Sequence, residues 1–146
     1  MQKILEDIEK NLLDDGGIVN RNVTEEDVVL LYELGFNLYQ NEEYAKGGEI
    51  FHILVVAKQL EFKYWVGLAA SLQMQKRYKD SLTSWSVCCF IDEHNPLPHF
   101  HAAECLFLLH DVDGGVRALT AAEHFDNEKI FQGKIFALKK KWKINE

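Results

Sequence analysis

A period of 34 residues is the feature of this chain that most restricts its fold. It appears in three pairs of neighbouring residues, each starting 34 positions after the last: Leu34-Gly35, Leu68-Ala69 and Ala102-Ala103. The same step relates larger residues further along, namely Tyr44, Tyr78 and Val112, then Phe51, Trp85 and Leu119. Two successive steps of equal length without an insertion indicate a structural repeat.

Each repeat has the pattern of two helices joined by a short turn. A helix-turn-helix unit of this length, with small and aromatic residues at fixed places, is typical of the tetratricopeptide repeat, or TPR. We therefore expect an all-α TPR solenoid in which the region 24–129 holds three repeats, at 28–61, 62–95 and 96–129. Thr24 is a good N-cap for the first helix because its hydroxyl can accept a hydrogen bond from a free backbone N–H.

Additional helices are expected at both ends of the repeats. Residues 1–23 read as an amphipathic helix and a connector, and the apolar stripe of this helix consists of Ile4, Leu5, Ile8 and Leu12. That stripe must be buried on its own solenoid or on a second chain, and we expect it to serve as a dimerisation element. At the other end, Asp126 is predicted to cap a helix from about Asn127 to Lys143, and residues 130–146 are expected to cover the last repeat.

Composition excludes several classes of protein. The chain has 23 acidic and 16 basic residues, for a net charge of −7, whereas nucleic-acid binding requires a clustered basic surface. Neither a secretory signal nor a membrane-spanning apolar run is visible, so we expect a soluble, cytoplasmic protein. The Lys139-Lys140-Lys141 run is interpreted as a solvated helix end.

Catalytic and metal-binding patterns are weak. The three cysteines show no CxxC spacing and are expected to be reduced, buried apolar residues. His101 and Cys105 are four residues apart on a predicted helix, but no third ligand has suitable spacing, so we expect no metal. There is also no nucleophile motif or phosphate-binding loop, and we predict neither an enzyme nor a bound cofactor.

The first helix of each repeat lines the concave surface of a TPR solenoid, so its outward positions are candidates for peptide binding. The candidates are mainly aromatic or aliphatic: Tyr32, Phe36, Tyr39, Lys63, Val66, Ala70, Met74, Leu97, Phe100 and Phe107. Gln73 and Glu104 are expected on the same surface. Such a strip suits an extended peptide with apolar anchors, because aromatic residues dominate many interfaces. The alternative is that these side chains belong to the core.

Three segments resemble a known family, the class II type III secretion chaperones. They are residues 31–44, residues 64–70 and, most specifically, residues 96–105 with the sequence PLPHFHAAEC. The resemblance implies a bacterial cytoplasmic chaperone that forms homodimers through its N-terminal helix. It also implies that the concave groove binds hydrophobic translocator proteins through an extended Pro-x-Leu-x-x-Pro-like segment, and that Tyr32, Phe36 and Tyr39 lie at the peptide pockets. The alternative is a generic TPR adaptor or regulatory scaffold.

Overall fold

The computed structural model describes residues 23–145, which contain seven α-helices and no strand. The helices are α2 (Glu25–Gln40), α3 (Tyr44–Ala57), α4 (Phe62–Met74), α5 (Tyr78–Ile91), α6 (Pro96–Leu108), α7 (Val112–Phe125) and α8 (Gln132–Lys141). The N-terminal helix predicted within residues 1–23, with its candidate dimerisation residues Ile4, Leu5, Ile8 and Leu12, lies outside the described residues apart from Val23.

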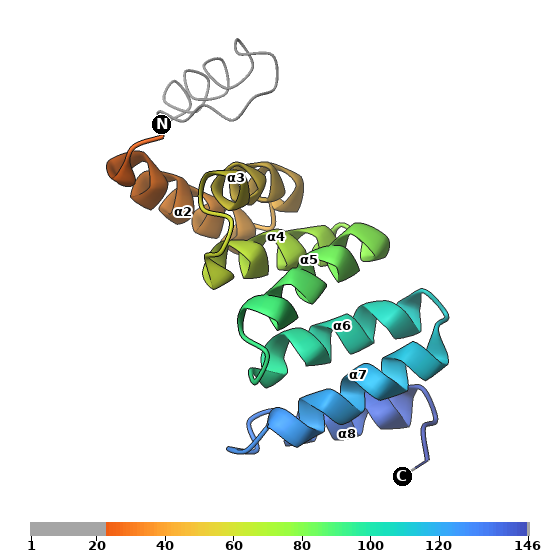
Figure 1. Ribbon diagram of the computed structural model, residues 1–146. Helices are drawn as coiled ribbons and strands as arrows, with labels where there is room; N and C mark the ends of the chain where they lie inside the picture. The colour runs from red at the N-terminus through yellow and green to blue at the C-terminus, as the bar shows by residue number, and fades with distance from the viewer. Residues whose placement is uncertain (1–22, 146) are drawn as a thin grey trace.

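The helices form antiparallel pairs that stack one after another. Each helix from α2 to α7 packs against the next one in the chain, and α2 also reaches α4 in the following pair. Figure 1 shows the stack running from α2 and α3 at one end to α7 and α8 at the other. This arrangement confirms the predicted all-α helical-repeat fold.

The turn within each pair repeats the same backbone geometry. Glu42, Lys76 and His110 are 34 residues apart and have φ angles of 61°, 62° and 64°. The following residue then donates its N–H to a carbonyl five residues back, in the bonds Glu43 to Leu38 at 2.9 Å, Arg77 to Leu72 at 3.0 Å and Asp111 to Leu106 at 2.9 Å. A left-handed residue closed by such a bond is a common helix ending. The sequence period is therefore visible in the backbone as well as in the packing.

Three of the described helices, α2, α6 and α7, start at a side-chain cap, and at α7 Asp111 Oδ1 accepts a hydrogen bond from the Gly114 N–H at 2.9 Å. Thr24 Oγ1 accepts a hydrogen bond from the Asp27 backbone N–H at 3.1 Å, and Asp27 Oδ2 accepts one from the Thr24 N–H at 3.0 Å, as a capping box requires. Asn95 Oδ1 accepts a bond from the Leu97 N–H at 3.0 Å. Proline is favourable at the first position of a helix, so α6 begins at Pro96.

The core lies between successive helices and depends on small side chains. Ala69, Ala103, Cys88 and Cys105 are all fully buried. Small residues at these places allow neighbouring helices to approach closely, which explains the small pairs in the 34-residue pattern. All three cysteines are free thiols, but only Cys88 and Cys105 are buried as predicted. Cys89 is partly exposed, with its Sγ 3.6 Å from His99 Nδ1.

The last helix begins later than predicted. Asp126 does not cap a helix at Asn127; its carboxylate instead accepts bonds from the Ile130 and Phe131 N–H groups at 2.9 and 2.8 Å. These bonds hold a turn, and α8 starts only at Gln132. No helix within residues 23–145 is long and apolar enough to span a bilayer.

Candidate peptide-binding groove

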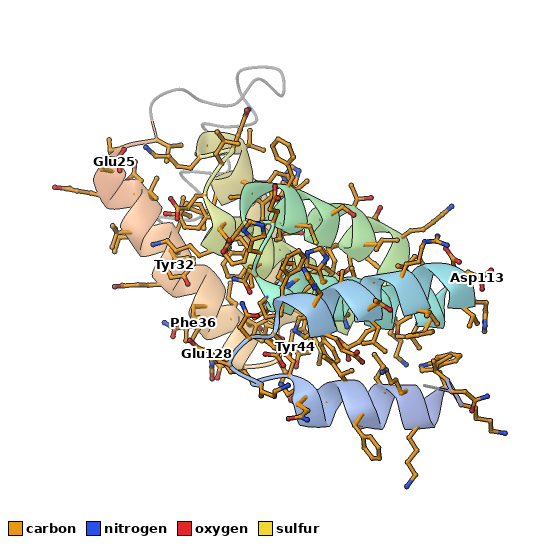
Figure 2. The ribbon with its side chains drawn as sticks, turned by 60° about the horizontal axis from the view of Figure 1, so that its bottom comes forward. Glu25, Tyr32, Phe36, Tyr44, Asp113 and Glu128 are labelled. Atoms are coloured by element: carbon orange, nitrogen blue, oxygen red, sulfur yellow. The ribbon has the colours of Figure 1, made fainter. Side chains whose placement is uncertain are left out.

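A cavity of about 440 Å³ lies along the first helices of the three pairs, α2, α4 and α6. Eight of the ten predicted peptide-binding residues line it: Tyr32, Phe36, Tyr39, Lys63, Val66, Ala70, Met74 and Leu97. Figure 2 shows Tyr32 and Phe36 along α2. The size and the largely apolar lining are typical of ligand-binding cavities.

Phe100 and Phe107 do not line this cavity, contrary to the expectation that they face the concave surface. Both are buried, and residues at the C-terminal end of the chain cover them. The ring of Phe100 lies 5.6 Å from that of Phe131, and the ring of Phe107 stacks on Trp142 at 5.5 Å. In the third repeat, the aromatic residues of the first helix therefore belong to the core, as the alternative interpretation of the sequence had it.

The aromatic wall of the cavity is held by contacts between rings. Tyr32 packs against Phe51 and Tyr64 with centroid distances of 6.2 and 5.5 Å, and Tyr39 packs against Tyr44 at 5.2 Å. Burial raises the pKa of Tyr39, and the neighbouring Tyr44 adds to this shift. The Tyr39 phenol is therefore uncharged at neutral pH.

Three lining side chains remain available at the mouth of the cavity. Phe36 is 48% exposed and Met74 is 49% exposed, so each keeps apolar surface that a ligand can bury. Lys63 Nζ lies 4.9 Å above the Tyr32 ring, a cation–π contact that holds the charge at the rim.

Residues that the sequence patterns did not identify form the floor. Phe51, Gly67, Trp85 and His101 also line the cavity. A Cβ atom at Gly67 would overlap the Phe51 ring, so glycine is needed for the ring to pack this closely against α4. Phe51 and Trp85 are 34 residues apart, and this spacing predicts that both pack between helices. The spacing does not indicate that both also face the cavity.

A polar cluster crosses this otherwise apolar floor. Trp85 Nε1–H donates to Gln73 Oε1 at 2.9 Å, and Gln73 Nε2–H donates to Glu104 Oε1 at 3.1 Å. His101 Nδ1 lies 2.6 Å from the same carboxylate oxygen. The His101 ring is also stacked on Trp85 at 4.8 Å. Each member is therefore fixed by another, and the cluster is preorganised.

The charge of Glu104 results from opposing effects. Burial opposes ionisation, but the hydrogen bonds from His101 and Gln73, with the charge of His101, outweigh it, so the pKa lies below the ordinary glutamate value. Both hydrogen bonds reach Oε1, and no donor within residues 23–145 bonds to Oε2. Oε2 can therefore accept an N–H group from a ligand.

Other surfaces are less suited to an apolar ligand. A larger recess of about 770 Å³ lies along α3, α4 and α5, but charged or polar side chains such as Glu49, Arg77 and Asp80 line it, and no Phe, Tyr or Trp of the described residues does. Its size alone does not make it the better candidate. In residues 23–145, no group of three or more His, Cys, Asp or Glu is placed to hold a metal ion.

Comparison with known proteins agrees with this geometry. The family model described as "Tetratricopeptide repeat" matches residues 62–95, the second predicted repeat. PcrH of Pseudomonas aeruginosa, solved in complex with the chaperone binding region of PopB, is 30% identical with a TM-score of 0.72. The match covers 81% of this chain and 95% of that one. The chain belongs to the family of type III secretion translocator chaperones.

Two other members of this family have similar sequences or folds. The translocator chaperone SycD of Yersinia enterocolitica, solved with a peptide of the translocator YopD, is 25% identical with a TM-score of 0.77, over 84% of this chain and 97% of that one. The Low calcium response locus protein H of Yersinia pestis is 30% identical over 99 residues, or 66% of this chain. The chain spans 59% of the length of that relative.

Proposed function

We propose that this protein is a chaperone of type III secretion translocator proteins, and that it binds an extended apolar segment of its cargo in the cavity along α2, α4 and α6. The aromatic lining of this cavity, crossed by one fixed polar cluster, is the observation that carries the proposal. PcrH and SycD were solved with segments of PopB and YopD respectively, which supports a ligand of the same kind here.

The geometry explains how such a segment is recognised. Apolar anchors of the peptide cover Phe36 and Met74, which are half exposed without a ligand. The Glu104 carboxylate accepts a peptide N–H, so the chain is held in one register while the anchors supply the affinity. Prolines in a Pro-x-Leu-x-x-Pro-like segment restrict its backbone beforehand, and this lowers the entropy lost on binding.

The proposed role needs no chemistry on the cargo. We infer a binding protein rather than an enzyme, acting in the bacterial cytoplasm without a cofactor, where it keeps apolar segments of the cargo out of water before export. The net charge of −7 opposes non-specific aggregation of the loaded chaperone.

A comparison of two exposed phenylalanines tests the cavity. Phe36→Ala removes an anchor inside the cavity, and Phe90→Ala removes an 81% exposed ring on α5 outside it. With a labelled peptide of the PopB chaperone-binding region, we expect Phe36→Ala to weaken binding by about tenfold or more, as for a hot-spot aromatic. Phe90→Ala should leave the affinity unchanged. Equal affinities of the two variants would contradict binding in this cavity.

Dimerisation is a separate part of the proposal. The stripe of Ile4, Leu5, Ile8 and Leu12 would pair with a second copy, so Leu5→Glu combined with Ile8→Glu should convert a dimer into a monomer in sedimentation equilibrium. An unchanged mass would mean that the stripe packs elsewhere. Peptide affinity should survive these substitutions, because the described residues that line the cavity all belong to the segment from Tyr32 to Glu104, away from the substituted positions in the sequence.

A further inference from the structure

The charge of this chain is divided very unevenly. Residues 129–145 contain six lysines and no acidic residue, while all 23 acidic residues and only ten basic ones lie elsewhere. An acidic protein with one strongly basic end has a charge asymmetry that is typical of binding to an anionic surface.

The helix α8 in this basic segment is only half covered. Ile135 and Leu138 are buried against α6 and α7, whereas Phe136 on the opposite face is 62% exposed and the preceding Ile130 is 67% exposed. A Cβ atom at Gly133 would meet no atom within 4 Å, so this face is open. Figure 1 places α8 at one end of the stack, and Figure 2 shows several of its side chains extending away from the other helices.

The lysines around these apolar residues are mostly without partners. Lys139 forms an ion pair with Glu123. By contrast, no carboxylate of residues 23–145 lies within 4.0 Å of the remaining lysines of the segment, Lys129, Lys134, Lys140, Lys141 and Lys143. These five side chains are exposed. Lys134 does lie over the Phe131 ring, with Nζ 5.8 Å from the ring centroid, but none of the five charges is taken up by an ion pair within the described residues.

We propose that the α8 end surface, formed by Ile130, Lys134, Phe136, Lys140 and Lys141, docks the protein on an anionic lipid surface. The lysine ammonium group is a compact charge that interacts with an anion without a fixed hydrogen-bond geometry, so it is attracted to the anionic headgroups of a fluid lipid layer. Phe136 and Ile130 insert between these headgroups, since exposed apolar side chains on a basic helix favour the interface.

The surroundings of α8 favour a lipid over an acidic protein. The recess beside this helix has a volume of about 310 Å³ and is lined by Glu123 and Asp126 as well as by Lys129 and Lys139, so it is not a basic pocket shaped for one acidic side chain. Phe136 borders this recess, but Ile135 is the only other apolar side chain among the described residues that line it. A folded partner therefore finds no apolar pocket there, whereas a fluid lipid layer adapts to the exposed side chains.

The acidic remainder of the protein sets the orientation on such a surface. All 23 acidic residues lie outside residues 129–145, and their repulsion from anionic lipid favours an orientation with the α8 end toward the membrane. No residue of the α8 end surface lines the cavity along α2, α4 and α6. The protein can therefore hold a peptide and dock on lipid at once.

Flotation with lipid vesicles tests the proposal. The full-length protein should float with phosphatidylcholine vesicles that contain about 30 mol% phosphatidylglycerol and not with pure phosphatidylcholine, and about 0.5 M salt should release it. Lys140→Glu combined with Lys141→Glu should reduce the bound fraction at least tenfold, because each lysine near an anionic surface contributes about fivefold. Phe136→Ser should reduce it about threefold or more.

Matched variants exclude a general effect of charge or surface apolarity. Lys46→Glu with Lys79→Glu changes the net charge equally on α3 and α5, and Phe90→Ser removes an 81% exposed ring on α5. Both should retain vesicle binding within about twofold, with unchanged helicity for all variants. Equal loss in these controls would refute the proposal, as would equal flotation with both vesicle types. Absence of flotation combined with binding of an acidic protein through Lys140 and Lys141 would assign the surface to a protein instead.

Discussion

Truncating Phe107 to alanine should destabilise the protein strongly without removing a side chain that can contact peptide. The Phe107 ring is fully buried and stacked on Trp142, and a Cβ atom at Gly115 would lie only 2.6 Å from it. The neighbouring side chains are packed too tightly to move into the space that the ring leaves. The substitution therefore creates a cavity about the size of the ring. Losses of this kind cost about 3–5 kcal/mol of unfolding free energy.

Phe36→Ala should have the opposite effects, with a small loss of stability and a large loss of peptide affinity. This ring is 48% exposed, so folding buries only about half of its apolar surface. Full burial of a phenylalanine contributes about 1.5–3 kcal/mol, and Phe36→Ala should therefore cost about 1 kcal/mol of unfolding free energy. Its main effect should be on peptide affinity.

Urea unfolding followed by circular dichroism separates the two. For a slope of about 2 kcal/mol per molar urea, Phe107→Ala should lower the midpoint by about 1.5–2.5 M and Phe36→Ala by about 0.5 M. Peptide affinity, measured where both variants are folded, should fall for Phe36→Ala only. If Phe107→Ala kept its midpoint and lost affinity as Phe36→Ala does, the assignment of Phe107 to the core would be refuted.

Four other expectations concern single positions. Gly67→Ala should lower the unfolding free energy by about 1–3 kcal/mol, because the ring packed against it must move; an unchanged urea midpoint would contradict this. Lys76→Gly should raise the unfolding free energy by about 0.5 kcal/mol, since relief of its left-handed backbone outweighs the added entropy of the unfolded chain; a lower urea midpoint would count against it. The pKa of Glu104 is lowered on folding, so its ionised form stabilises the fold above the ordinary carboxyl pKa and this stabilisation is lost as pH falls through the folded value. The wild type should therefore lose more unfolding free energy than Glu104→Gln on acidification, and parallel pH profiles would argue otherwise. Burial raises the pKa of Cys88 to about 12, so its thiol should react with a disulfide reagent at about pH 8 only as the protein unfolds; rapid modification of the native chain would disagree.

The 34-residue period was sufficient to predict the repeat architecture. Small residues at fixed places, such as Ala69 and Ala103, are those that close helix packing requires, so their spacing predicts which helices pair. Local chemistry also predicted the cap at Thr24. The same reasoning placed the start of the last helix too early, because the carboxylate of Asp126 binds two N–H groups of a turn instead of starting a helix at once.

The polar cluster in the cavity could not be predicted from the sequence. Gln73 and Glu104 were recognised as outward positions, but Trp85 comes from a second helix and was expected only to pack. The contact between them joins three helices, α4, α5 and α6. Whether two polar groups meet across helices depends on crossing geometry, which the spacing of residues along the chain does not contain.

The 34-residue period identifies equivalent positions in the three repeats, but it does not show which of these positions other parts of the chain cover. The third repeat is an example. Val66 and Phe100 are one period apart, as are Gln73 and Phe107, and the first member of each pair lines the cavity. The second member is buried because α8 follows the third pair: Phe131 packs over Phe100 at one end of this helix, and Trp142 packs over Phe107 at the other. A solenoid must cover the apolar face of its last repeat. The aromatic residues of α6 therefore stabilise the end of the stack, whereas equivalent residues of α2 and α4 stay available for a ligand.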